Sequence, residues 1–197
     1  SHEPVGYFTD RFIKTVELGA LQKGENTLLL EMPYMPESNL EWCYVLGDFG
    51  VEARGARAWV TEPVRSLDFS DWTHQGLPFY GANVTYEWTV DVEDGEYAVE
   101  IDKFRAPVIA VAVDGKDAGR IALLPYRVEL GRLSAGRHTI SITVFGNRFG
   151  SFGQLHCSMD TVYWCGPGAW RTKDAGYSYE YQFRRTGLLM APVLLKK

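Results

Sequence analysis

The sequence predicts an all-β chain that folds as an antiparallel β-sandwich of the jelly-roll kind. One stretch alternates strictly between apolar and polar residues, which is the period of a strand with one buried face. Many other short apolar runs are separated by glycine and proline turns. No stretch shows the 3.6-residue apolar period of an amphipathic helix. Together these patterns favour two packed antiparallel sheets.

The alternating stretch runs from Val84 to Val92. Its apolar side chains fall on one face, namely Val84, Tyr86, Trp88, Val90 and Val92. Turn signals at 93–96 and at Asp114-Gly115 separate it from later strands. We predict these strands over Tyr97–Phe104, Pro107–Val113, Gly119–Leu123, Tyr126–Leu130, Arg137–Phe145, Tyr177–Arg184 and Leu188–Leu195.

An internal repeat gives the domain organisation. Val16–Leu30 aligns at a constant offset with Val128–Ile142, and Val, Glu, Leu, Gly, Leu, Gly and Thr match in place. Each copy predicts a strand end, a glycine turn and another strand. The spacing exceeds the roughly 20–50 residues of solenoid repeats and suits two tandem sandwich domains of roughly 100 residues each.

Strand-rich sequence precedes the second copy of the repeat, whereas little precedes the first. We therefore expect residues 1–66 to be the C-terminal remnant of an upstream sandwich with its linker, and 67–197 to be a complete sandwich. The chain would then be the C-terminal part of a larger protein. Unpaired strands in 1–66 need partners, and a homodimer through this segment is one way to supply them.

Composition excludes several classes of partner. The chain has 197 residues, 46% of them hydrophobic and 14% aromatic, which favours a packed globular interior. Its net charge of −5 argues against nucleic acid and anionic membranes, because both require a basic surface. Apolar runs are also too short to span a bilayer. The sequence predicts a soluble acidic protein and leaves open whether its compartment is the bacterial cytoplasm, the periplasm or the exterior.

Two glycine-rich aromatic loops are the candidate binding regions, because loops on rigid β-scaffolds concentrate binding residues. The first precedes Val84, and the second runs over Gly146–His156 and 164–171. Aromatic rings beside planar polar side chains suit sugars, whose C–H faces stack on rings while their hydroxyls form hydrogen bonds. The candidate ligand-binding residues are Trp72, His74, Tyr80, Asn147, Arg148, Phe152, Gln154, His156, Trp164 and Trp170. The alternative is that these aromatics belong to the core.

Other polar residues give weaker signals. Arg148 and Arg171 are either carboxylate binders or ion-pair tethers of the loop. His138, at a hairpin start, is predicted to be only a surface residue. Asp68 and Asp71 are candidate oxygen ligands for a structural Ca²⁺, the one cofactor that the sequence suggests. Cys43, Cys157 and Cys165 lack metal-ligand spacing, so we expect reduced core cysteines, with a Cys157–Cys165 disulfide as the alternative.

Several short motifs resemble a known family. They are Tyr86 in a strand, Val111-Ala-Val-Asp-Gly115, Gly119, Pro125-Tyr126, Glu129-Leu130, Leu133 and Gly136. They resemble the sugar-binding jelly roll of family 2 glycoside hydrolases and related galactose-binding-like domains. The segments Gly146–His156 and Trp164-Cys-Gly-Pro167 are similar to the C-terminal sandwich of large bacterial glycoside-hydrolase-like proteins, including α-L-rhamnosidase-like ones. The sequence departs from the family in having Asp114 for the usual Asn and in lacking the paired arginines near the start of the jelly roll.

The resemblance implies a non-catalytic carbohydrate-binding accessory domain of a bacterial glycoside hydrolase, whose catalysis belongs to another domain. Its partners would be a glycan or glycoside and the parent's catalytic domain. The alternative is a structural module that packs on that catalytic domain and has no ligand. A catalytic fragment would need two loop carboxylates close in space, and no catalytic motif is present.

Overall fold

The computed structural model describes residues 3–38, 42–158, 173 and 176–197. The chain divides into two compact units, Ser1–Trp42 and Cys43–Lys197. It is almost entirely β, with 38% strand and 4% helix, which confirms the predicted all-β sandwich. The elements are β1 (Gly6–Phe8), β2 (Asp10–Thr15), β3 (Gly50–Arg54), β4 (Arg57–Thr61), the 3-10 helix η1 (Trp72–His74), β5 (Val84–Val92), β6 (Gly95–Glu100), β7 (Phe104–Arg105), β8 (Ile109–Val113), β9 (Lys116–Ile121), β10 (Arg127–Leu133), β11 (Gly136–Val144), α1 (Phe149–Phe152), β12 (Gly187–Leu188) and β13 (Val193–Lys196).

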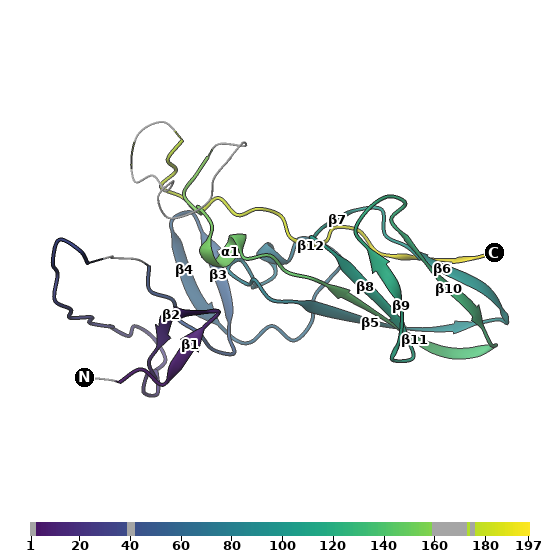
Figure 1. The fold of residues 1–197 in the computed structure, drawn as a ribbon, viewed down its shortest axis with the longest axis horizontal. Helices are drawn as coiled ribbons and strands as arrows, with labels where there is room; N and C mark the ends of the chain where they lie inside the picture. The colour runs from purple at the N-terminus through teal and green to yellow at the C-terminus, as the bar shows by residue number, and fades with distance from the viewer. Residues whose placement is uncertain (1–2, 39–41, 159–172, 174–175) are drawn as a thin grey trace. The chain divides into compact units, whose positions relative to one another are not determined.

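One layer of the sandwich is a four-stranded antiparallel sheet in the order β5-β11-β8-β9 (Figure 1). The predicted alternation decides its register, because a shift by one residue would turn every apolar side chain of β5 outward. Tyr86 therefore lies opposite Ile142, which in turn lies opposite Val111. Val84 and Val144 form the last pair of the same ladder. These rows supply one side of the hydrophobic core.

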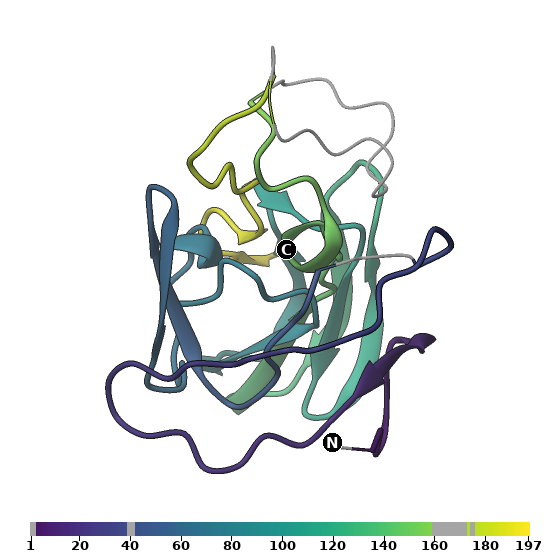
Figure 2. The same ribbon diagram turned by 90° about the vertical axis from the view of Figure 1, so that its left-hand side faces the viewer.

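The second layer has the strand order β10-β6-β13. Its strands β6 and β10 are labelled in Figure 1, and Figure 2 shows the same ribbon turned by 90°. Val99 of β6 pairs with Val128 on one side and Leu194 on the other, so a second apolar row faces the core. The short pair β7–β12 adds buried Leu188. The predicted strand from Leu188 to Leu195 is thus split into β12 and β13, which join different sheets. Whether the connections follow the jelly-roll order stays a prediction.

The hairpin β3–β4 belongs to the same compact unit as the sandwich. It is joined to the rest by backbone hydrogen bonds, from Val51 N–H to the carbonyl of Gly76 (2.8 Å) and from Tyr181 N–H to the carbonyl of Gly55 (2.9 Å). The proposed domain boundary between residues 66 and 67 is not tested by these contacts and stays a prediction. The hairpin matters for function because it leads into the segment from Glu62 to Asp71.

The first copy of the repeat does not form the predicted strands. In the unit Ser1–Trp42 the described sheet is the hairpin β1–β2, and Val16–Leu30 contains no strand. Its apolar side chains are exposed; Leu29, for example, is 76% exposed. A strand needs a ladder partner, and this segment has none among the described residues of its own unit. The second copy does form β10, a turn and β11, as predicted.

The predicted strand Tyr177–Arg184 is also wrong. Tyr181 and Phe183 of this segment join a cluster of aromatic side chains instead of a ladder, while Tyr179 is 75% exposed. Among the described residues, an isolated bridge joins Cys157 and Tyr177. The rings of Phe79, His156, Tyr181 and Phe183 lie with centroids about 5 Å apart. Aromatic packing and strand pairing produce the same period of two in sequence, so the pattern alone could not separate them.

His138 is mostly covered, rather than the surface residue predicted from its position. Its Nδ1 lies 2.7 Å from the Asp114 carboxylate and its Nε2 lies 3.0 Å from the Ser134 carbonyl. Both partners accept hydrogen bonds, so only the doubly protonated imidazolium satisfies both. Asp114 also accepts from the Thr139 backbone N–H. Together these contacts tie the turn after β8 to β11.

The Asp114–His138 contact predicts a pH dependence of stability. Hydrogen bonds from Thr139 and His138 lower the pKa of Asp114, and those to Asp114 and Ser134 raise the pKa of His138. The aspartate contribution is lost as pH falls through the lowered pKa of Asp114, and the histidine contribution is lost as pH rises through the raised pKa of His138. Both are fully present between about pH 3.9 and 6.5, the unfolded-state values.

We therefore expect the difference in Tm between wild type and His138→Gln to be largest near pH 5 and to shrink above the raised pKa of His138. Thermal unfolding followed by circular dichroism from pH 4 to 9 measures it. The nearby charges of Lys116, Asp117 and Arg132 are present in both proteins, so they cancel in the difference. A difference that does not vary with pH would contradict the proposed imidazolium.

Among the described residues, none of the helices has the length and apolar content needed to cross a bilayer. Cys157 is buried, as expected of a core cysteine, whereas Cys43 is exposed, so the prediction of a core position was wrong for Cys43. Cys165 lies outside the described residues, so the alternative Cys157–Cys165 disulfide stays a prediction.

Candidate functional site

The two loops predicted to bind ligand lie against each other. The hydroxyl of Ser151 donates to the carbonyl of Phe79 (2.8 Å), and the backbone N–H of Gly146 donates to the Asn83 side chain (3.2 Å). Glycines allow this approach. A Cβ on Gly81 would meet the Ser151 hydroxyl at 2.8 Å, and one on Gly146 would overlap the carbonyl of Ala82. We call this contact the loop junction.

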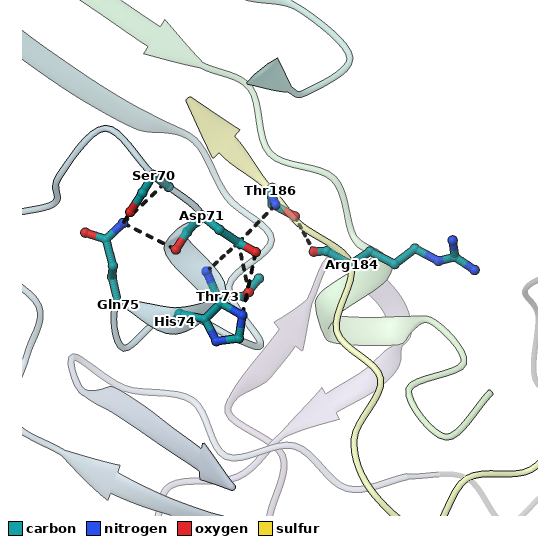
Figure 3. Close-up of polar contacts among 7 residues, drawn as sticks. All are labelled: Ser70, Asp71, Thr73, His74, Gln75, Arg184 and Thr186. Atoms are coloured by element: carbon teal, nitrogen blue, oxygen red, sulfur yellow. Dashed lines mark hydrogen bonds and ion pairs between the residues drawn. The ribbon is translucent and has the colours of Figure 1, made fainter. Parts of the chain in front are cut away.

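Asp71 holds the beginning of the first loop in place (Figure 3). One oxygen of its carboxylate accepts hydrogen bonds from the backbone and hydroxyl of Thr73 and from the backbone N–H of Thr186. Asp71 thereby caps η1 and ties it to the chain before β12. The exposed ring of His74 lies 3.9 Å from the other carboxylate oxygen. Asp71 therefore has a structural role, as a carboxylate that fixes a turn.

The Ca²⁺ suggestion gains no support from this geometry. One of the two Asp71 carboxylate oxygens already accepts three hydrogen bonds. The side chain of Gln75 links to the backbone of Asp68, Ser70 and Asp71. Within the described part of the chain, no three His, Cys, Asp or Glu side chains are grouped closely enough to hold a metal ion.

Several of the predicted ligand-binding residues are covered by protein. Trp72 is 0% exposed and belongs to the core, so its ring has no face open to a ligand; as a ligand platform it was predicted wrongly. Gln154 is also buried. His156 is half-buried: its Nδ1 contacts the Ser178 carbonyl and its ring packs on Tyr181. These side chains support the loops from within.

Other predicted residues remain at the surface. His74, Asn147 and Arg148 are exposed, and the Arg148 guanidinium lies over the ring of Phe152 at 5.9 Å. The Asn147 side chain accepts from the backbone N–H of Phe149, so it shapes the turn before α1. Trp164, Trp170 and Arg171 lie outside the described residues, and their proposed roles stay predictions.

Tyr80 is the predicted residue that opens into a hollow. The hollow has a volume of about 380 Å³, and we call it the Tyr80 hollow. Its wall is formed by the strand end Asn83–Tyr86, by 64–67 and by 47–49, together with Leu77 and Tyr80. Tyr80 is 39% exposed, and its hydroxyl donates to the carbonyl of Asn83 (3.1 Å), which fixes the ring.

The wall combines apolar surface with a few polar groups. Phe49, Leu77 and Tyr80 supply apolar surface. An ion pair lies on the wall, with Arg65 Nη2 3.0 Å from Asp48 Oδ2 and both side chains about three-quarters exposed. An exposed pair of this kind contributes roughly 0–1 kcal/mol to stability, so its groups are available to a ligand at little cost. Concave apolar surface with a few polar groups is typical of small-molecule sites.

Tyr86 also lines the hollow, and its hydroxyl is an exception in the core. The side chain is 8% exposed, and its oxygen is buried without a hydrogen-bond partner among the described residues. Burial raises the pKa of the phenol, so it stays neutral at ordinary pH. Leaving a buried hydroxyl unpaired costs about 1–3 kcal/mol. Such a group needs an explanation, and a ligand in the adjoining hollow is one.

Sequence reasoning missed Arg65, Tyr86 and Phe49 as site residues. The sequence correctly places Tyr86 on the buried face of its strand. The alternation of apolar and polar residues does not show what surrounds its hydroxyl. Arg65 and Asp48 lie in segments without a motif, and the hollow appears only when 47–49 and 64–67 are placed beside β5. The one usable signal was Tyr80, next to a glycine in an aromatic loop.

The loop junction predicts the effect of filling a glycine. Gly146→Ala places a Cβ against the carbonyl of Ala82 and should lower the free energy of unfolding by about 1–3 kcal/mol, as overpacking does. Urea unfolding measures this. Gly19→Ala is the matched control, because nothing lies within 4 Å of its added Cβ, and it should stay within about 0.5 kcal/mol of wild type. Equal stability of the two variants would show that the junction is not tightly packed.

No protein-family model matches the chain, and no curated protein sequence matches it significantly. Among solved structures, the chain is similar to a rhamnosidase from Novosphingobium sp. PP1Y, with a TM-score of 0.41 and 18% identity over 74% of this chain and 14% of that one. It is also similar to a GH2 beta-galacturonidase from Eisenbergiella tayi in its glycerol-bound and galacturonate-bound structures, with TM-scores of 0.38 and 0.37, at 21% and 22% identity, each over 60% of this chain and 21% of that one. The chain thus spans about a fifth or less of the length of each of these proteins.

Proposed function

We propose that this chain is a non-catalytic β-sandwich domain that binds a carbohydrate in the Tyr80 hollow, as an accessory part of a glycoside-hydrolase-like protein. The observation that carries the proposal is the hollow itself. Its wall combines a fixed tyrosine ring, an accessible Arg65–Asp48 pair and the side chain of Tyr86, whose hydroxyl is buried without a hydrogen-bond partner among the described residues.

The chemistry of the wall suits a sugar. The C–H groups of a pyranose pack on an aromatic ring, and its hydroxyls both donate and accept hydrogen bonds. Tyr80 supplies the ring, Arg65 supplies donors, and Asp48 supplies acceptors. The volume of about 380 Å³ is at the lower end of the roughly 300–1,000 Å³ of small-molecule sites, which suits a single sugar residue.

The same wall argues against glycoside hydrolysis at this place. Glycosidases use two carboxyl groups on either side of the bond, about 5–9.5 Å apart. Asp48 is the single carboxylate in the wall of the hollow, and it is paired with Arg65. Binding without catalysis is therefore the better account of this site.

The parent protein is proposed from the motifs that resemble the sugar-binding jelly roll of family 2 glycoside hydrolases. Val111-Ala-Val-Asp-Gly115 does form the end of β8 and a turn, with Asp114 and Gly115 both at positive φ. Within such a parent, catalysis would be carried out by another domain. We expect that catalytic domain and a glycan to be the partners of this chain.

A second candidate function is a structural module that packs on the catalytic domain without a ligand of its own. The observation that favours it is the loop before Pro125, where Leu123 and Leu124 are 82% and 77% exposed. Neighbouring exposed leucines at a turn are unusual unless something covers them. This role and carbohydrate binding use different surfaces, so a test at the Tyr80 hollow separates them.

The carbohydrate proposal predicts that Tyr80→Ala abolishes sugar binding. Isothermal titration of the full chain against methyl glycosides of common hexoses should give weak binding in wild type, with Kd in about the millimolar range, and none in the variant. Tyr179→Ala is the control, since this tyrosine is 75% exposed and lies outside the hollow. Flat traces for wild type across the panel would overturn the proposal and leave the structural module.

A further inference from the structure

We propose that the Tyr80 hollow selects a neutral sugar over a sugar acid, and that the Tyr86 hydroxyl is a contact that determines this specificity. The inference rests on the proposed function, because it concerns the ligand of the same site. It follows from the charges on the wall and from the Tyr86 hydroxyl. Among the buried polar atoms that have no hydrogen-bond partner in the described residues, this is the one whose side chain lines the hollow.

The charges on the wall disfavour an anionic ligand. Arg65 and Asp48 are the charged side chains of the wall, one of each sign, so the hollow offers no net charge to a ligand. A carboxylate that approached Arg65 would also approach Asp48, whose oxygen is 3.0 Å from the guanidinium, and would be repelled. A sugar acid would also have to replace Asp48 on the guanidinium. A neutral ligand keeps the pair intact.

The same pair can also form hydrogen bonds to a ligand. A hydrogen bond from Arg65 Nη2 to Asp48 Oδ2 joins the two side chains, so Arg65 has further N–H donors and Asp48 has a second oxygen for a ligand. Adjacent sugar hydroxyls fit this arrangement: one accepts from the guanidinium while its neighbour donates to the carboxylate. A carboxylate group cannot donate, so it leaves the aspartate unsatisfied.

Tyr86 would contribute a hydrogen bond to the ligand. Its hydroxyl can donate and accept, and it is neutral at ordinary pH because burial raises the pKa of the phenol. The ligand's hydroxyl would supply the hydrogen-bond partner that the Tyr86 hydroxyl lacks among the described residues. The oxygen is closed to solvent in the unliganded chain, so a side chain must move to admit the ligand. We expect Phe69 to be that side chain, because its ring centroid lies 5.4 Å from that of Tyr86 and the residue is 39% exposed.

The experiment uses the full chain and two probes, a methyl hexopyranoside that binds in the panel above and the hexuronate of the same configuration. We expect the neutral sugar to bind at least about tenfold more tightly, with little dependence on salt. Asp48→Asn should reduce or reverse the preference for the neutral sugar, because it removes the repulsion between the aspartate and the carboxylate of the hexuronate. Arg54→Gln is the control: it removes another exposed arginine, which pairs with Glu52 outside the hollow, and should leave both affinities unchanged.

Tyr86→Phe separates the ligand role from a purely structural one. It removes an unpaired hydroxyl, so Tm should stay the same or rise, while affinity for the neutral sugar should fall by about tenfold. Tyr97→Phe is the matched control, because this buried hydroxyl donates to the Glu93 carbonyl at 3.0 Å, away from the hollow. It should lower Tm and leave affinity unchanged.

The outcomes distinguish this inference from the proposed function. If no sugar binds wild type, or if Tyr80→Ala does not affect binding, the proposed function fails and the inference fails with it. If a sugar binds in a Tyr80-dependent way but the uronate is preferred, or if Tyr86→Phe keeps full affinity, the inference alone is overturned. Full affinity in Tyr86→Phe would indicate that the hydroxyl is satisfied by a trapped water rather than by a ligand.

Discussion

The ladder between β5 and β11 is the constraint on which the rest of the structure depends. All nine residues of each strand are paired in one continuous register, from Val92 opposite Gly136 to Val84 opposite Val144. That last pair lies where the first loop ends and the second loop begins. The two segments are far apart in sequence, yet Asn83 and Gly146 become neighbours because Asn83 directly precedes β5 and Gly146 lies two residues after the end of β11. The loop junction and the Tyr80 hollow are therefore consequences of strand register.

The strands of the sandwich were predictable because burial forces alternation on them. β5, β8, β10 and β11 all overlap predicted strands, and the apolar residues of β5 lie on one face. The two wrongly predicted strands have a common physical cause. Tyr177–Arg184 and Val16–Leu30 carry strand-like patterns, but a strand also requires a partner, and the sequence of a segment does not state whether one is present. Aromatic clustering accounts for the first segment.

The site was predictable in part. Glycines in two aromatic loops indicated close backbone approach, and the structure brings these loops together at Gly81 and Gly146. Which aromatic ring faces outward was not predictable, since Trp72 and Tyr80 lie in one loop with similar surroundings in sequence. Trp72 packs beneath Tyr80 with ring planes nearly perpendicular, at 88°, so one ring supports the other. The Arg65–Asp48 pair depends on tertiary placement alone.

The crowding at Gly81, Gly146 and Gly150 bears on how this domain can change. Added side chains there would meet backbone or side-chain atoms, so these loops have little freedom to acquire new contact residues. The wall of the hollow is different at Asp48 and Arg65, because both side chains are about three-quarters exposed and are not packed in the core. Diversification of ligand preference, by natural drift or by a directed library, should therefore concentrate on 47–49 and 64–67. The glycine-rich side would serve as the invariant frame against which those positions vary.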